Sequence, residues 1–250
     1  MSYKELNLRK AIENKDYNTY SKEAICKIDS IFNDFLNSAN NEVVIKSNLS
    51  KGLPIENINK IAGPILEEWV CTVFESKKKQ YDLLQVKPQK KTALSDVDLK
   101  FNIGKKEIKI KIDVKATCEE IKGSGKSPNI TSFGKIRDAY LNNQNFIFLI
   151  FSIKYSVEKM SIGKDGFFTD KLLVKDFNIY DFKFIADNDL TYNPALGTGQ
   201  IQIKDIHNIK IKQRNVDDLL RLLDTKYLNS SKRTFSDFRK LAVKNKWLDS

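Results

Sequence analysis

The stretch Glu107-Ile-Lys-Ile-Lys-Ile-Asp-Val-Lys115 alternates apolar and charged residues, which is the pattern of a half-buried β-strand. A second acidic stretch of the same kind, Ser95-Asp-Val-Asp-Leu-Lys-Phe101, stands just upstream. Only a short polar connection separates the two. We therefore expect a central β-hairpin, formed by residues 96–103 and 107–115, inside a mixed α/β fold.

Asp113 and Lys115 are two positions apart, so on a strand their side chains leave the same face. One or two carboxylates, with waters and a substrate phosphate, are the usual ligands of Mg²⁺. A fixed positive charge beside such a site orients the attacking water and stabilises negative charge on phosphorus. The pair favours a Mg²⁺-dependent phosphodiester hydrolase. An ordinary ion pair on a solvated strand is the alternative that this short pattern leaves open.

The overall charge favours a nucleic-acid substrate. Lys and Arg number 43 against 32 Asp and Glu, which gives a formal net charge of +11. An excess of this size is typical of proteins that bind nucleic acid. A membrane-surface protein would need a basic amphipathic helix with an aromatic face, and the sequence shows no clear example.

The chain of 250 residues, 41% of them hydrophobic, is long enough to bury a core. We expect one domain over residues 1–250, because no linker-like segment or internal repeat interrupts it. The first residues lack the apolar stretch of a signal peptide, and no apolar run could span a bilayer, so we expect a soluble, cytoplasmic protein. Cys26, Cys71 and Cys118 form no close pair and are expected to be free, buried thiols.

Periodicity predicts the remaining elements. Helices are expected over residues 21–36, 58–74, 131–141, 215–227 and 234–245. Further strands are expected over residues 81–87, 146–153, 177–185 and 200–211. Pro64 should stand at a first turn or a kink, and Thr234 should cap the last helix, with Asp237 three residues on.

Two further features argue against other enzyme classes. The segment Gly123-Ser-Gly-Lys-Ser127 looks like the end of a phosphate-binding loop, but Glu120 stands where that motif needs a glycine. His207 is the only histidine, which excludes a two-histidine metal site and disfavours a Ser-His or Cys-His nucleophile.

Glu67, Asp96, Asp113 and Lys115 follow the Glu…Asp…Asp-x-Lys pattern of the restriction-endonuclease-like, PD-(D/E)xK nucleases. Longer strings are more specific. They are Lys115-Ala-Thr117, the segment from Ser124 to Phe133, the segment from Asn48 to Pro64, and the segment from Tyr192 to His207. Together they resemble the type II restriction endonucleases of the HpaI family and, more distantly, those of the HincII type. The resemblance is weakest over residues 1–41 and 157–175.

The resemblance implies a restriction-endonuclease-like fold, with a central mixed β-sheet flanked by helices. It implies a homodimer that uses Mg²⁺ to cut both strands of a short palindrome, GTTAAC, and leaves blunt ends. A partner methyltransferase would act on the same site without forming a stable complex. The resemblance assigns metal binding to Asp96, Asp113 and Val114, the orientation of water to Lys115, and an auxiliary acid role to Glu67. Asp98 shares a strand face with Asp96 and stays open as the alternative ligand.

Two segments, about 119–133 and 191–207, are expected to contact DNA. Their polar side chains can reach phosphates or base edges. The expected DNA-binding residues are Lys122, Lys126, Ser127, Asn129, Thr131, Asn193, Gln200, Gln202 and Lys204. Each of them could instead be an ordinary turn residue or the polar side of a strand.

Twofold symmetry of a palindrome favours a dimer. An apolar stripe of Ile25, Ile28, Ile31, Phe32 and Phe35 could form its interface or could face the chain's own core. Two other functions remain possible from the sequence: a DNA-binding protein on the same fold without cleavage, and a repair nuclease that recognises DNA structure.

Overall fold

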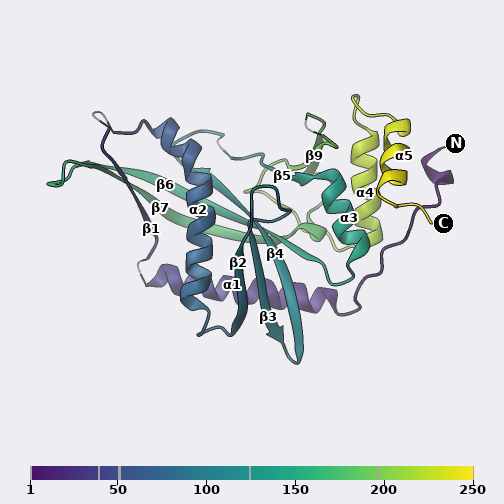
Figure 1. The fold of residues 1–250 in the computed structure, drawn as a ribbon, viewed down its shortest axis with the longest axis horizontal. Coiled ribbons are helices and arrows are strands. Elements are labelled where there is room, and N and C mark those ends of the chain that lie inside the picture. The colour runs from purple at the N-terminus through teal and green to yellow at the C-terminus, as the bar shows by residue number, and fades with distance from the viewer. Residues whose placement is uncertain (1, 39, 50–51, 124, 196, 250) are drawn as a thin grey trace. The chain divides into compact units, whose positions relative to one another are not determined.

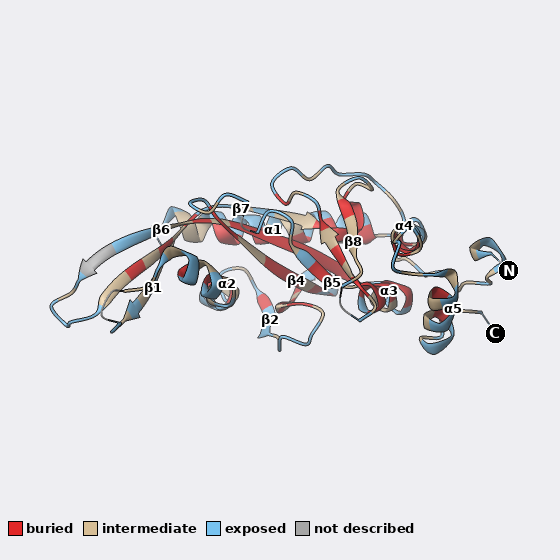
Figure 2. Ribbon diagram, turned by 90° about the horizontal axis from the view of Figure 1, so that it is seen from above, coloured by how far each residue is buried: buried red, intermediate tan, exposed pale blue. Residues whose placement is uncertain are grey.

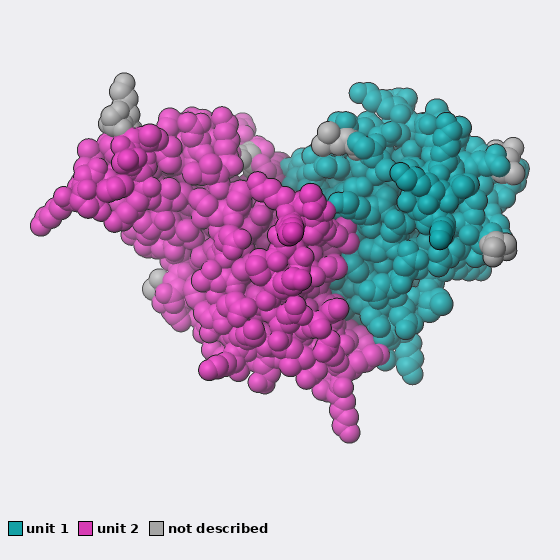
Figure 3. Space-filling view, in the orientation of Figure 1, with its two compact units in different colours: residues 1–19, 127–147, 181–250 teal, residues 20–126, 148–180 magenta. Residues whose placement is uncertain are grey.

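The computed structural model describes residues 2–38, 40–49, 52–123, 125–195 and 197–249, apart from the side chains of residues 160 and 161 (Figure 1). The chain divides into two compact units, shown in Figure 3. We call residues 20–126 with 148–180 the large-sheet unit, and residues 1–19 with 127–147 and 181–250 the small-sheet unit.

The large-sheet unit is built on a six-stranded sheet with the order β1-β7-β6-β4-β3-β2. Its strands are β1 (Glu42–Ser47), β2 (Leu83–Pro88), β3 (Val97–Ile103), β4 (Lys106–Cys118), β6 (Ile147–Ile162) and β7 (Phe168–Asp181). Its helices are α2 (Ile55–Lys77) and all but the first three residues of α1 (Tyr17–Asn37). Strands β2, β3 and β4 form an antiparallel meander, so the expected central hairpin is confirmed as β3–β4.

The burial of β4 and β6 follows directly from their sequences. Ile108, Ile110 and Ile112 of β4 are buried, while the charged residues between them are not. Six consecutive residues of β6, from Phe148 to Ile153, are all buried, so this strand is covered on both faces (Figure 2). The charged residues of β4 are therefore anchored by the buried residues that alternate with them in the strand.

Helix α1 uses its apolar stripe inside the large-sheet unit. Ile28, Ile31 and Phe32 are completely buried. The Phe32 ring lies 4.5 Å from the ring of Phe151 in β6 and 5.1 Å from that of Phe74 in α2. The stripe thus faces its own core, which was one of the two alternatives.

Helix α2 packs against β2 and β4 and carries Glu67. It begins at Ile55, three residues before the expected start, so Pro64 lies in its interior. Because proline cannot donate a backbone hydrogen bond, it interrupts the helical ladder there, one turn before Glu67.

The small-sheet unit has an antiparallel three-stranded sheet in the order β5-β9-β8. Its strands are β5 (Asn129–Ser132), β8 (Leu190–Asn193) and β9 (Gln200–Ile203), and its helices are α3 (Phe133–Asn142), α4 (Val216–Leu228) and α5 (Phe235–Lys244). Short 3-10 turns cover Tyr3–Glu5 and Phe182–Phe184. The rings of Phe133, Tyr227, Phe238 and Trp247 form its aromatic core.

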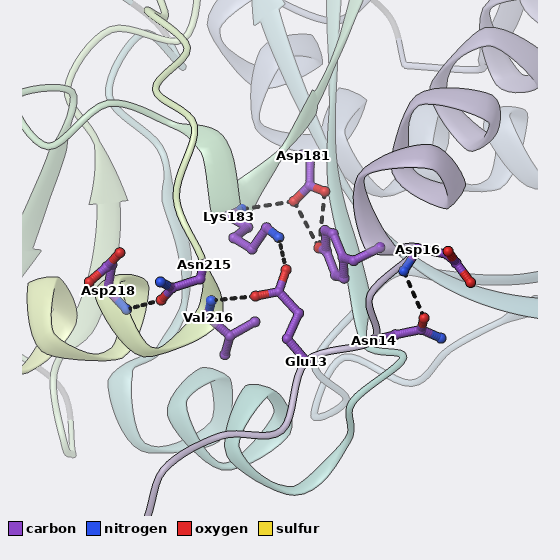
Figure 4. A network of polar contacts seen from close by, with 9 residues as sticks. Glu13, Asn14, Asp16, Asp181, Lys183, Asn215, Val216 and Asp218 are labelled. Carbon is purple, nitrogen blue, oxygen red and sulfur yellow. Dashed lines mark hydrogen bonds and ion pairs between the residues drawn. The ribbon is translucent and has the colours of Figure 1, made fainter.

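A polar network fastens the N-terminal segment to the rest of the small-sheet unit (Figure 4). The Lys183 ammonium is fully buried, pairs with Glu13 and lies 3.4 Å from the centre of the Tyr17 ring. The other carboxylate oxygen of Glu13 accepts a 2.7 Å hydrogen bond from the backbone N–H of Val216, at the start of α4. Burial of the ammonium lowers the pKa of Lys183. One carboxylate therefore ties the N-terminal segment to two later parts of this unit.

Several expectations need correction. Strands β1, β5 and β8 were not predicted, and the strand expected over 200–211 ends at Ile203. Residues 129–132 form β5, so the helix expected from Thr131 begins at Phe133. Cys26 is exposed, whereas Cys71 and Cys118 are buried. Over the described part of the chain, no helix combines the length and apolar character needed to cross a membrane.

Candidate functional site

Four of the expected site residues come together in the large-sheet unit, where the start of β3 lies beside residues 112–115 of β4. The antiparallel register pairs Val97 with Ile112, so Asp96 reaches the residues that follow Ile112. The backbone N–H of Asp96 donates to the Ile112 carbonyl at 2.9 Å. Oδ2 of Asp96 accepts a 2.7 Å hydrogen bond from the backbone N–H of Val114. The hairpin thus fixes the Asp96 carboxylate against the strand that carries Asp113 and Lys115.

Asp113 and Lys115 form a close ion pair. Nζ of Lys115 lies 2.7 Å from Oδ2 of Asp113, which is only 4% exposed. Burial raises the pKa of Asp113 to about 7; the negative charges of Asp96 and Glu67 add to the rise, and Lys115 opposes it. For Lys115, burial lowers the pKa, but the carboxylates of Asp113, Asp96 and Glu67 outweigh burial and raise it. Lys115 is therefore held as a cation.

Glu67 approaches this group from α2. Burial of its half-buried carboxyl raises its pKa, with a further contribution from the charge of Asp96 and an opposing one from Lys115. A carboxyl in this environment holds a proton more readily than a solvated one. The structure thus brings together the four side chains that the sequence pattern singled out.

Asp98 has different partners. Its carboxylate accepts hydrogen bonds from Ser95 Oγ at 2.6 Å and from Lys111 Nζ at 2.8 and 3.0 Å. Lys111 stands directly opposite Asp98 in the β3–β4 register. The charge of Asp98 is thus neutralised within the hairpin, whereas Asp96 faces Val114 and the Asp113 strand.

A paired substitution tests this difference. Asp96→Asn is expected to lose cleavage by about two orders of magnitude, the scale of removing one preorganised electrostatic group. Asp98→Asn is expected to retain most of the cleavage activity, because Asp98 accepts a hydrogen bond from Ser95 and pairs with Lys111. Single-turnover cleavage rates would show the contrast. A larger loss at position 98 would reverse the assignment of the two aspartates.

The donor set suits a small hard cation. In the part of the chain that the structure describes, no group of three or more His, Cys, Asp or Glu residues is arranged to hold a metal. Mg²⁺ does not need one, because it retains waters and binds through one or two carboxylates and the substrate. Oδ2 of Asp113 is buried and, besides its contact with Lys115, accepts no hydrogen bond of good geometry among the described residues. With Asp96 and the Val114 carbonyl nearby, the residues fit such an ion.

The pKa of Asp113 leads to a prediction about stability. Because its folded pKa of about 7 exceeds the ordinary value of 3.8, the folded state binds the extra proton between these values, and stability falls as pH rises through this window. Asp113→Asn removes this penalty. The melting temperature of the metal-free variant should therefore fall less than that of the original protein as the pH rises from about 4 to about 7. If the melting temperatures of the two proteins changed with pH in the same way in a chelating buffer, the buried carboxyl of Asp113 would not be the cause of the pH dependence.

Strand β4 is followed by the first expected DNA-binding segment. Within the large-sheet unit, Lys122 and Lys126 are both exposed. Gly125 has a φ of +67°, and a Cβ atom there would lie 2.4 Å from the carbonyl oxygen of Ala116. Only glycine allows the segment to lie this close to β4.

Most of the other expected DNA-binding residues lie on one polar face of the small sheet. Antiparallel pairing sets Gln202 beside Asn129 and Thr191, and Gln200 beside Asn193 and Ser132. Ile201 and Ile203 point to the buried side. We call Asn129, Asn193, Gln200 and Gln202 the amide face. Side-chain amides are groups that read adenine edges in the major groove.

The amide face is braced by contacts within the small-sheet unit. Ser127 Oγ donates to the Lys204 carbonyl at 2.6 Å, and the Gln202 side-chain amide donates to the Ser127 carbonyl at 2.8 Å. The Asn193 amide donates to Asn129 Oδ1 at 3.4 Å. Lys204 is exposed just beyond β9. These groups are therefore close together and partly ordered.

Thr131 lies apart from this face. It pairs with Ile201 and is 8% exposed, so its side chain shares the buried side of the sheet. Sequence reasoning also missed Thr191 and Ser132, which stand beside Gln202 and Gln200. The alternation of polar and apolar residues in β9 indicates a polar face, but the strands that pair with β9 and carry Ser132 and Thr191 were not predicted.

Comparisons with known proteins show to which family the chain belongs. The profile of the family described as "Type II restriction endonuclease HpaI" matches residues 4–246. The type II restriction enzyme HpaI of Haemophilus parainfluenzae is 45% identical over 252 aligned residues, which cover 99% of each chain. Among solved structures, the NlaIV restriction endonuclease aligns with a TM-score of 0.45 and 13% identity over 86% of this chain and 83% of its own. The chain therefore belongs to the HpaI family of type II restriction endonucleases.

Proposed function

We propose that the protein is a Mg²⁺-dependent endonuclease that cuts double-stranded DNA at a specific short sequence. The observation that carries the proposal is the cluster of Asp96, Asp113 and Lys115, held by the β3–β4 hairpin beside Glu67 of α2. Family membership and the net charge of +11 support the same substrate.

Each residue has a role that follows from its surroundings. Asp96, Asp113 and the Val114 carbonyl would hold the ion. A bound Mg²⁺ would neutralise negative charge and lower the pKa of a water molecule that it binds. Lys115, whose raised pKa keeps it charged, can orient the attacking water and stabilise negative charge on the phosphate. Glu67, whose pKa is also raised, can hold a proton near the same point.

The proposed recognition sequence is GTTAAC, cut to blunt ends. It rests on the resemblance to the HpaI family, and the amide face offers suitable groups for its A·T pairs. A methyltransferase that modifies the same sequence would protect the host DNA without binding this protein stably.

We further propose that the protein acts as a homodimer, because a palindrome presents two equivalent phosphates to a twofold pair of sites. The apolar stripe of α1 is a poor candidate for the interface, since Ile28, Ile31 and Phe32 are buried within the large-sheet unit. Another surface must supply it.

Plasmid digestion tests the proposal. Incubation with Mg²⁺ should give discrete, reproducible fragments, and mapping of their ends should give the site and the position of the cut. DNA that is retarded in gels but never cut would indicate a binding protein. Cuts restricted to nicks or junctions would indicate a structure-specific nuclease.

A further inference from the structure

We propose that Arg233 is a positioning residue that determines how strictly the enzyme selects its sequence. It would act by holding the chain between β8 and β9 in the form that sets Asn193 and Gln200 on the amide face. This inference rests on the proposed function and adds a residue to it. Arg233 lies more than 25 residues beyond the second expected recognition segment, which ends at residue 207.

The guanidinium of Arg233 makes one hydrogen bond to the side chain of Tyr192 in β8 and two to the connection that follows β8. Nε donates to the Tyr192 hydroxyl at 2.9 Å. Nη2 donates to the carbonyl of Pro194 at 3.0 Å and to that of Gly197 at 2.7 Å. The carbonyls of Pro194 and Gly197 thus accept from the same nitrogen atom, which holds these two residues close to each other.

Tyr192 extends this clamp. Its hydroxyl accepts from Arg233 and donates to the carbonyl of Thr198 at 2.8 Å. Gly199 lies so close to the Tyr192 ring that a Cβ atom would stand 2.1 Å from the hydroxyl oxygen, and its φ is +80°. The connection is therefore packed directly against the residue that Arg233 holds.

The ends of the connection belong to the amide face. Asn193 immediately precedes Pro194, and its Oδ1 accepts a 3.0 Å hydrogen bond from the backbone N–H of Ala195. Gln200 immediately follows Gly199 and pairs with Asn193 across the strands. Arg233 therefore holds Pro194 and Gly197, which lie next to or near the residues that carry both amides.

The geometry requires arginine and not merely a positive charge. A guanidinium presents five N–H donors in a rigid plane, whereas a lysine ammonium is a compact point charge on a flexible stem. Lysine could satisfy one of the three acceptors but could not bridge them in the same way. Arg233 also lies over the Tyr227 ring, with Cζ 5.8 Å from its centre, which further fixes the plane.

The test compares Arg233→Ala and Arg233→Lys with Arg239→Ala, a control at an exposed arginine on α5. For each protein, kcat and KM are measured on the cognate duplex and on duplexes with one base pair changed. Both Arg233 variants should lose about tenfold or more of the cognate preference, the scale of one base contact. The control should keep it. Gly199→Ala, which displaces Tyr192 from the other side, should have the same effect as the Arg233 variants.

The outcomes separate the possible roles. If Arg233→Lys restores the original preference, or if affinity for every duplex falls equally with the preference unchanged, the residue acts by charge and the inference is wrong. A lower melting temperature with unchanged preference would also overturn it, because only stability would then depend on the clamp. If the original protein cuts no duplex in Mg²⁺, the proposed function itself fails before any variant is compared.

Discussion

Lys115→Met is expected to reduce cleavage by about 10²- to 10³-fold or more, the scale of removing one preorganised hydrogen-bond donor from an active site. The ammonium lies 2.7 Å from the Asp113 carboxylate and is the cation nearest to it among the contacts of the described residues. Methionine keeps a similar length without the charge. The loss should appear in kcat, because the charge acts mainly where negative charge develops on the phosphate.

The fold should tolerate this change. Without Lys115, the buried Asp113 loses the group that opposes its raised pKa, so it can take up a proton instead of remaining a buried anion. Lys109→Met is a suitable control, because Lys109 is an exposed lysine on the same strand and faces Lys100 across the hairpin. Rapid-quench cleavage and gel-shift binding would be measured for both. Normal cleavage by Lys115→Met would remove it from the catalytic group.

The sequence was most informative where a physical pattern repeats over many residues. The pattern in residues 107–115 predicted β4 and the similar pattern in residues 95–101 predicted β3, while the short connection between them predicted that they pair. Because that register is local, the pairing of Asp96 with the Asp113 strand could also be anticipated. Alternation could not choose between Asp96 and Asp98, since both leave the same face. The choice depends on Lys111, whose cross-strand contact with Asp98 exists only in the folded hairpin.

Sequence periodicity could not predict the shortest strands or the contacts between residues far apart in the chain. Strands β5 and β8 have only four residues each, too few to show a period, and they become strands by pairing with β9. Without them, the buried position of Thr131 could not be foreseen. The clamp of Arg233 on Pro194 and Gly197 joins residues more than 35 positions apart. No local pattern reports a contact of this kind.

Asp224→Ala is expected to cause the largest loss of stability in the small-sheet unit. Asp224 pairs in a fork with Arg137 at 2.7 and 3.0 Å, and both side chains are 1% exposed. Removing one partner of a buried pair costs about 3 to 5 kcal/mol, because the other charge stays buried without compensation. Tyr3 would also lose the acceptor that its hydroxyl contacts at 2.8 Å. For a chain of this length the melting temperature should fall by roughly 6 to 20 °C.

Two further variants show whether the buried charge is the cause. Arg221→Ala removes an exposed charge from the same helix and should change the free energy of unfolding by no more than about 0.5 kcal/mol. The double variant Arg137→Met with Asp224→Leu removes both charges and should recover much of the loss, since no unpaired ion remains. The Arg137 guanidinium also lies over the Trp247 ring, 4.2 Å from its centre, so recovery should be incomplete. If the double variant were no more stable than Asp224→Ala in thermal unfolding, lost packing would be the cause instead of an unpaired charge.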